Sequence, residues 1–382
     1  MTGTSSGRGL DLRAFLLSSD GWPYLLVPFI PLAVALDLVG ASAVAVFFTS
    51  AAGVVPTAAL MGRATEELAA RSGPGIGGLL NVTFGNAPEL IIALFALQKG
   101  LHEVVKASLT GSVIGNILLV LGMSMFVGGL GRERQEFNRV AAGAQSSMLL
   151  LAAVALVMPA IFEGINGSGL PSPGAERVAY DGAVEHLSLI VAAVLIASYC
   201  AGLVFSLKTH RSLFNPPHDQ SEEEEQGAAP WSVRRSVLAL AVAGVAVAVM
   251  SEVLVGSISE AATSIGLTEF FVGAVVVATA GNAAEHWVAV LVARKNKMDL
   301  SVNIAIGSSA QIALFVAPVL VVVSFLLGPA PMPLVFNGFE LGAFLLAVLV
   351  ANHVTAEGES TWFEGVQLLA VYAVVAIAFA FA

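Results

Sequence analysis

Long apolar runs separated by short charged segments are the dominant pattern along this chain. Runs near 20 residues cross a ~30 Å hydrocarbon core as helices, so the pattern predicts an all-α polytopic membrane protein. Reading the runs between charged breaks gives about eleven candidate helices. They lie near residues 23–39, 41–62, 78–98, 104–130, 140–162, 185–207, 234–255, 269–293, 300–327, 333–351 and 362–382. The first two are the least clearly divided, because only residues 37–40 separate them.

The composition agrees with a bilayer environment. Of 382 residues, 57% are hydrophobic and 12% are charged, whereas a soluble domain carries about 25% charged residues. The single cysteine, Cys200, lies in an apolar run. It excludes a disulfide framework or a CxxC metal motif and is expected to be a small packing residue. The net charge of −10 owes much to the glutamate run 222–225 and indicates no nucleic-acid partner.

The positions of Lys and Arg predict how the helices are oriented. With a cytoplasmic N-terminus, all but three of the 17 Lys and Arg residues fall in inside segments, the exceptions being Lys99, Lys106 and Arg177. Cytoplasmic loops attract Lys and Arg, so the N-terminus is expected in the cytoplasm and the C-terminus outside. The chain has no clear signal-peptide cleavage site. Because it also has no long N-terminal extension, the cell (plasma) membrane is favoured over an organelle membrane.

Two segments of the chain repeat one another. Residues 85–122 and 281–318 align without a gap at a constant offset. The matched positions include Gly85/Gly281, Asn86/Asn282, Ala87/Ala283, Glu89/Glu285, Lys99/Lys295, Gly111/Gly307 and Ser112/Ser308. The offset spans five helices, an odd number, so the second copy is inverted. Inverted repeats are typical of secondary transporters, whose substrate site lies near the membrane midplane.

This offset predicts the organisation of the whole chain. The expected parts are a cytoplasmic N-terminal tail (1–22), an extra first helix (23–39), a first five-helix repeat (41–207), a cytoplasmic acidic linker (208–233) and a second five-helix repeat (234–382). The linker either only joins the halves or also collects cations at the cytoplasmic mouth.

Each repeat carries a Gly-Asn-Ala-x-Glu box in the middle of a predicted helix. Glu89 is 11 residues past Gly78, or ~16 Å along a helix, and Glu285 is similarly deep. A carboxylate at this depth costs several kcal/mol unless it is paired, protonated or facing water. The alternative is a neutral carboxyl group hydrogen-bonded inside the bundle, which the repetition of the box disfavours.

The residues of the boxes suit a cation bound by oxygen atoms. Asn86 and Glu89 are three residues apart and are expected on one helix face, and Asn282 and Glu285 repeat this spacing. Carboxylate and amide oxygens favour Ca²⁺, Mg²⁺ or Mn²⁺. The glycine before each box either lets the helix break and offer backbone carbonyl groups or only allows close packing. These glycines are Gly85 and Gly281.

Other polar side chains are placed to complete the site or its access routes. Ser112 and Ser308, in the helices that follow the boxes, either bind the cation or hold helices together. Asn116 and Gln311 are weaker candidates of the same kind. His286 is either a proton relay or a packing residue. Three acidic residues near or within membrane depth are candidates for the ion pathway, with an interfacial position as the alternative: Glu66, Glu252 and Glu260.

Two facing carboxylates also predict proton coupling without further parts. Like charges in an empty site repel each other, so the pair takes up protons. A divalent cation needs both groups ionised, so metal and protons compete for the same oxygens. Exchange then requires only that the site reach each side of the membrane in turn. The asymmetry of the boxes, Pro88 in the first against Ala284 and His286 in the second, predicts that proton handling leans towards Glu285.

At the two boxes the sequence resembles the calcium/proton exchangers of the calcium/cation antiporter superfamily. The resemblance rests on residues 77–90 in the first half and on residues 281–286, 297–300 and 305–318 in the second, and it extends over the helix layout beyond about residue 22. It implies a secondary active antiporter, not an enzyme, that exports cytosolic Ca²⁺ in exchange for H⁺ and needs no cofactor.

The resemblance also implies roles for single residues. Glu89 and Glu285 would be the central carriers of cation and proton. The three acidic pathway candidates fall where the family has acidic residues. Pro88, Gly115 and Trp287 depart from the family's usual residues, which puts cation selectivity and rate in question.

Other functions stay open at this point. A transporter could use another ion, such as Na⁺ or Mn²⁺. An intramembrane enzyme would need a nucleophile with its base or a histidine-rich zinc set, and the six histidines are scattered. A passive channel fits less well with paired carboxylates at one depth. The expected partners are therefore Ca²⁺, H⁺ and the lipid bilayer, with homo-oligomerisation left open.

Overall fold

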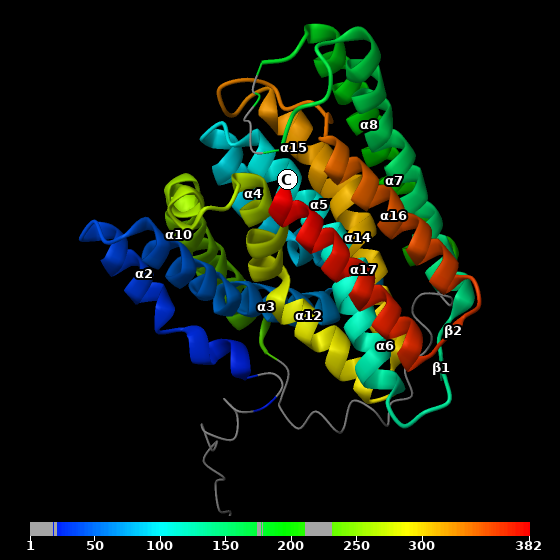
Figure 1. Ribbon diagram of the computed structural model, residues 1–382. Coiled ribbons are helices and arrows are strands. Elements are labelled where there is room, and N and C mark those ends of the chain that lie inside the picture. Colours follow the sequence, from blue (N-terminus) through cyan, green and yellow to red (C-terminus); the bar gives the residue numbers. More distant parts are fainter. Residues whose placement is uncertain (1–17, 19–20, 174–176, 178, 211–230) are drawn as a thin grey trace, which may run out of the picture.

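The computed structural model describes residues 18, 21–173, 177, 179–210 and 231–382. Helices make up most of this part (Figure 1), which confirms the predicted helical class. Nine helices within the described residues are long and apolar enough to cross a membrane, and two shorter apolar helices cover Trp22–Leu38 and Ala87–Gln98. The count of eleven spans and the inverted repeat stay predictions. The predicted tail 1–22 and linker 208–233 lie almost entirely outside the described residues.

The first half of the chain is a series of helices joined by short connections. In order these are the 3₁₀ helix η1 (Trp22–Leu26), α2 (Phe29–Leu38), α3 (Ala43–Gly85), α4 (Ala87–Gln98), α5 (His102–Ile114), the π-helical η2 (Gly115–Val120), α6 (Leu121–Gly129), α7 (Arg139–Asn166), α8 (Gly182–Val204) and the π-helical η3 (Phe205–Thr209).

The second half has a similar succession of elements. In order these are α10 (Val233–Ile265), α11 (Glu269–Phe271), the π-helical η5 (Val272–Val277), α12 (Ala278–Arg294), α13 (Met298–Val302), the π-helical η6 (Asn303–Gly307), α14 (Ser308–Gln311), the π-helical η7 (Ile312–Val316), α15 (Ala317–Ser324), α16 (Gly338–Thr355) and α17 (Trp362–Phe381).

Helix α3 bends sharply in its second half. It begins after Ser42, whose hydroxyl accepts the backbone N–H of Ala45. A Cβ atom at Gly77 would lie 2.3 Å from the carbonyl oxygen of Ala69, whereas eight residues span ~12 Å in a straight helix. The predicted gap between spans 41–62 and 78–98 is therefore a bend inside one helix, and Glu66 lies within that helix rather than at its end.

Among the described residues, two short strands are a small exception to the all-helical class. β1 (Gln135–Glu136) pairs antiparallel with β2 (Glu359–Ser360), so that Gln135 faces Ser360 and Glu136 faces Glu359. The pairing joins the segment between α6 and α7 to the segment between α16 and α17. It lies at one edge of the bundle (Figure 1).

The two halves share one core. α2, α3 and α10 lie together on one side of the bundle, with α3 packed along α10 (Figure 1), and α12 runs between them and the remaining helices. One continuous cluster of buried apolar residues includes members of both halves, such as Ile117 and Leu314. Because both halves contribute to this core, helices from different halves face each other at the centre of the bundle.

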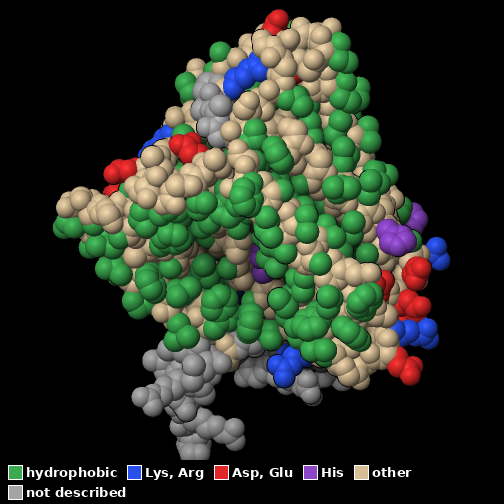
Figure 2. Space-filling model, viewed as in Figure 1, with side chains coloured by type: hydrophobic (Ala, Val, Ile, Leu, Met, Phe, Trp, Pro, Cys, Tyr) green, Lys and Arg blue, Asp and Glu red, His purple; other side chains and the backbone are tan. Residues whose placement is uncertain are grey.

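The outer surface of the helices is apolar, as the bilayer requires. Hydrophobic side chains are spread over the face shown in Figure 2, and the charged side chains lie towards its margins. Exposed apolar residues include Val154 on α7 and Val245 on α10. Cys200 is also exposed, on α8. The expectation that it packs inside the bundle is wrong, because its position on α8 faces outward.

Candidate functional site

The first box lies at a break between two helices. α3 ends at Gly85 and α4 begins at Ala87, with Asn86 between them at φ −99° and ψ 21°. Pro88 explains the break, because it has no N–H to donate to the carbonyl of Phe84 and its ring collides with a continuing helix. The spacing alone predicted that Asn86 and Glu89 share one helix face. Because of the break, they do not. Asn86 precedes α4, and Glu89 lies in its first turn.

The second box lies inside a continuous helix. Asn282 and Glu285 are both within α12, and Asn282 is 1% exposed. Ala284 stands where the first box has proline, so no backbone donor is lost. Both residues lie on one continuous helix here, as the spacing predicted, whereas the first box is broken.

The two boxes meet at the centre of the bundle. A Cβ atom at Gly281 would lie 3.6 Å from Cγ and 3.7 Å from Oε1 of Glu89. The absence of a side chain on this glycine lets the first carboxyl group approach α12. The carboxyl groups of Glu89 and Glu285 lie within electrostatic reach of each other. Gly85, by contrast, has only Asn81 Oδ1 near its Cβ position, at 3.9 Å.

Each asparagine of the boxes donates a hydrogen bond to the other half of the chain. The amide nitrogen of Asn86 donates to Gln311 Oε1 at 2.7 Å. The amide nitrogen of Asn282 donates to Ser112 Oγ at 3.1 Å and to the carbonyl of Ala278 at 3.0 Å. Because the nitrogens are fixed in this way, the side-chain carbonyl oxygens of both asparagines are turned away from these partners.

Three buried oxygen atoms at this centre have no hydrogen-bond partner within the described residues. They are Asn86 Oδ1, Glu89 Oε2 and Asn282 Oδ1. Buried acceptors without a partner are uncommon in native proteins, and each calls for an explanation. Glu89 and Ser112 also line a small cavity. These features make the centre a candidate cation site.

The second carboxyl group has a hydroxyl partner and an acidic neighbour. Ser308 Oγ donates to Glu285 Oε2 at 3.3 Å, so this serine reaches the box of its own half. Glu66, on α3, lies within electrostatic reach of Glu285. The imidazole of His286 is 2.9 Å from Asn116 Oδ1. The structure thus brings four further predicted residues to the central region.

The remaining two predicted residues lie elsewhere on the surface. Glu252 and Glu260 are exposed on α10. A Cβ atom at Gly256, midway between them, would lie 3.1 Å from Lys99 Nζ. No hydrogen bond or ion pair in the described part of the chain joins either glutamate to the boxes, so their place in an ion pathway stays a prediction.

A buried charged cluster that was not predicted from the sequence lies towards the other end of α5. Lys106, 1% exposed, contacts Glu103 and donates to the carbonyl oxygen of Val335 at 2.9 Å. Glu340, 0% exposed, forms the capping box of α16 with Asn337. The i, i+3 spacing of Glu103 and Lys106 and the Asn-x-x-Glu pattern at 337–340 were the available signals.

The oxygen donors at the centre are carboxyl, amide and hydroxyl groups. Within the described residues, no three His, Cys, Asp or Glu side chains converge as a metal cluster. Such mixed oxygen ligands suit Ca²⁺.

Comparison with known proteins agrees with this architecture. Residues 42–208 and 235–381 match the family described as sodium/calcium exchanger protein. A Ca²⁺/H⁺ antiporter of Synechocystis sp. is 46% identical over 374 residues, covering 94% of this chain and 96% of the relative. The Ca²⁺/H⁺ antiporter ChaA of Bacillus subtilis is 45% identical over 357 residues, covering 93% and 97%.

A solved structure resembles the fold over almost the whole chain. The structure of native YfkE superposes with a TM-score of 0.79 at 41% identity, covering 94% of this chain and all of that one. With its apolar helices, the chain is a multi-pass membrane protein. It belongs to the sodium/calcium exchanger protein family, and within it to the calcium/proton exchangers that its two boxes resemble.

Proposed function

We propose that this protein is a secondary active antiporter that exports cytosolic Ca²⁺ in exchange for H⁺ at the centre formed by the two boxes. The observation that carries the proposal is the group of three buried oxygens without hydrogen-bond partners, from Asn86, Glu89 and Asn282. Close relatives named as Ca²⁺/H⁺ antiporters support the choice of ions.

The proposed ligands are the two carboxylates and the two asparagine carbonyl oxygens. Ser112 and Ser308 orient or supplement them, since each hydrogen-bonds a member of the second box. The helix break after Gly85 adds backbone carbonyl groups, because the last turn of a helix leaves them without intrahelical partners. Gly281 contributes by leaving space for Glu89.

Proton coupling follows from the same groups. With Ca²⁺ bound, both carboxyl groups are ionised and their charge is balanced by the cation. When Ca²⁺ leaves, two like charges would remain together in a medium of low dielectric constant, so protons replace the cation. Protons and Ca²⁺ therefore occupy the site alternately. Access from each side in turn would couple the two fluxes.

Two neighbours of Glu285 are candidates for guiding protons. Glu66 lies within electrostatic reach of it. His286 is held by Asn116 one residue further along α12. Glu252 and Glu260 are proposed as pathway residues only on the basis of the family resemblance. We further propose a plasma-membrane location with a cytoplasmic N-terminus.

Replacing either central carboxyl group is expected to abolish exchange while leaving the fold intact. Glu89→Gln and Glu285→Gln each remove one unit charge next to a divalent cation. This loss costs several kcal/mol, or about a hundredfold or more in affinity. The measurement is Ca²⁺-driven proton movement in proteoliposomes, read with a trapped pH dye.

Glu185→Gln is the matched control, because Glu185 carries a carboxyl group in the first turn of α8, outside the site. It should exchange like the unmodified protein. Size-exclusion profiles in detergent check folding of all three variants. Full activity of either central variant would refute the two-glutamate site. An unmodified protein that moves no protons on Ca²⁺ addition would refute the proposed function itself.

A further inference from the structure

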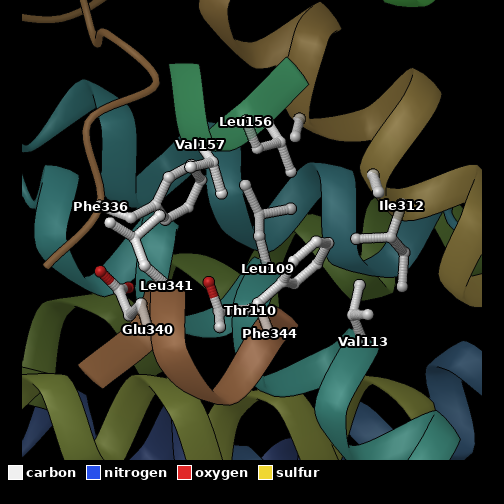
Figure 3. A pocket seen from close by; sticks show the side chains of 12 residues that line it. Leu109, Thr110, Val113, Leu156, Val157, Ile312, Phe336, Glu340, Leu341 and Phe344 are labelled. Atoms are coloured by element: carbon white, nitrogen blue, oxygen red, sulfur yellow. The ribbon is translucent and has the colours of Figure 1, made fainter. Parts of the chain in front are cut away.

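A second cavity lies next to the proposed cation site, beyond Leu109 and Ile312. These two side chains line both the small cavity at Glu89 and an apolar cavity between α5, α7, η7 and α16 (Figure 3). They are 5% and 1% exposed. These two buried side chains therefore lie between the two cavities.

Glu340 is the carboxyl group of this second cavity. It is 0% exposed, and its Oε2 accepts the backbone N–H of Asn337 at 2.8 Å. Its Oε1 is buried and has no hydrogen-bond partner within the described residues. The Thr110 hydroxyl lies on the same side of the cavity (Figure 3). All other lining residues are apolar, including Leu156 and Val157 of α7.

The charged groups that face Glu340 come from α5. Glu103 and Lys106 both lie within electrostatic reach of it, while α7 and η7 present apolar side chains to the cavity. Two carboxyl groups and one ammonium group carry a net negative charge when all are ionised. Arg177 also lies within electrostatic reach of Glu103, but its ion pair with Glu163 adds no net charge. A buried net charge is costly, and one additional proton makes this cluster neutral.

The cluster also has a connection towards the surface. Lys106 Nζ lies 3.5 Å from the hydroxyl of Tyr180, which is half-buried. Tyr180 lies outside the membrane-spanning helices, and burial raises the pKa of its phenol, although Lys106 opposes this shift. The phenol therefore stays neutral and adds no charge. Under the predicted topology this end of the bundle faces outside.

We propose that Glu340 is a proton-transfer residue that links the outer side to Glu89. A proton from the outer solution binds the Glu340 carboxylate. It then passes through the cavity past Thr110 to the Glu89 carboxylate when Leu109 and Ile312 separate. Only O–H bonds to these groups form and break, and the charge moved is that of one proton. The inference rests on the proposed exchange and adds a proton path distinct from the cation path.

The test compares two transport modes of the full-length protein in vesicles of phosphatidylethanolamine and phosphatidylglycerol. Ca²⁺/H⁺ exchange needs proton transfer, whereas ⁴⁵Ca²⁺/Ca²⁺ exchange at equal pH does not. Glu340→Gln keeps a carbonyl oxygen for the helix cap but cannot carry a proton. It should lower Ca²⁺/H⁺ exchange about tenfold or more and leave ⁴⁵Ca²⁺/Ca²⁺ exchange within about twofold.

Glu364→Gln provides the matched control. Glu364 forms the equivalent capping box with Thr361 at the start of α17 but lines neither cavity described here. This variant should retain both transport modes. A loss of Ca²⁺/H⁺ exchange in both glutamine variants would point to helix capping and overturn the proposal.

Other outcomes separate this inference from the proposed function. If the unmodified protein exchanges Ca²⁺ for H⁺ and Glu340→Gln does so equally, only the inference fails. Equal loss of both transport modes in folded Glu340→Gln also overturns it. If Glu340→Gln does not fold, the Thr110→Val variant tests the proposed proton path instead. It should slow Ca²⁺/H⁺ exchange several-fold and spare ⁴⁵Ca²⁺/Ca²⁺ exchange, and unchanged Ca²⁺/H⁺ exchange refutes the path.

Discussion

The side-chain amides of Asn86 and Asn282 show how the two halves of the chain depend on each other. Gln311 accepts from the first and Ser112 from the second. The oxygen and the nitrogen of an asparagine amide are bonded to the same carbon and exchange places when the amide rotates by half a turn. A hydrogen bond that fixes the nitrogen therefore also fixes the direction of the oxygen. Each half thus orients an oxygen of the other half at the proposed cation site.

Loss of one of these anchors should weaken Ca²⁺ binding without removing a charged ligand. Ser112→Ala deletes the hydroxyl that accepts from Asn282. A hydrogen bond of this kind contributes about 1 kcal/mol, which corresponds to roughly fivefold in affinity. Isothermal titration of Ca²⁺ into the detergent-solubilised protein measures the change.

Ser309→Ala is the control for this prediction. The Ser309 hydroxyl is also buried but donates to the carbonyl of Ala305 in its own helix at 2.8 Å. Its loss should leave the Ca²⁺ affinity unchanged. Equal affinities for Ser112→Ala and the unmodified protein would show that the Asn282 oxygen needs no anchor.

The identities of the central site residues could be predicted from the sequence, but their hydrogen-bond partners could not. The repeated box pointed to Asn86, Glu89, Asn282 and Glu285, because polar groups at membrane depth are costly and stand out. The pairing of Asn86 with Gln311 depends on which helices face each other, and one sequence carries no such information. Glu340 was missed for a different reason, since a capping glutamate at a helix start looks ordinary until burial is known.

Helix packing at the centre includes close contacts between α5 and η5. A Cβ atom at Gly111 would lie 1.9 Å from the carbonyl oxygen of Ala274. Small residues allow transmembrane helices to approach so closely that backbones touch. Four π-helical segments, η2, η5, η6 and η7, lie in the helices around this contact. Such segments occur frequently at functional sites.

Gly111→Ala is expected to destabilise the bundle, because the new methyl group meets backbone that cannot rotate away. Overpacking of this kind costs about 1–3 kcal/mol or more. The expected result is a lower midpoint of thermal unfolding, followed by fluorescence-detected size exclusion. Gly115→Ala is the control, since its Cβ position has nothing within 4 Å. Similar midpoints for both variants would contradict the close contact.

The apolar runs predicted most helices well, but their internal irregularities were not predictable. Hydrophobicity indicates which segments enter the bilayer, whereas π turns and bends arise from contacts between helices. The Pro88 break was partly accessible, because proline at this position removes a backbone donor. The continuation of α3 through its bend was not predictable from the sequence, since a Gly-Pro-Gly segment, here residues 73–75, ordinarily ends a helix.

For the whole molecule, the distribution of Lys and Arg makes the strongest prediction beyond the fold. The orientation that it gives places the Glu340 cluster outside and the connection after α12 inside. The single native cysteine makes a direct test simple. Replacing it gives a background in which an added cysteine is the only thiol.

In a Cys200→Ser background, Lys295→Cys should react with a membrane-impermeant maleimide only after cells are permeabilised. Ser168→Cys should react in intact cells. Both positions are exposed in the structure, so access to reagent, and not burial, decides the result. The reverse pattern would invert the topology and move the proposed proton path to the cytoplasmic side.

The bend in α3 has a mechanical consequence. A flexible loop between two membrane-spanning helices lets one helix move without moving the other. A bend inside a continuous helix is stiffer, so displacement of one limb is passed to the other limb. Since Met61 in the first limb of α3 lies next to Gly244 of α10 and the second limb ends at Asn86, we expect tilting of the second limb to displace the first box. If the proposed exchange proceeds by alternating access, we expect α3 to move the first box relative to the second box on α12.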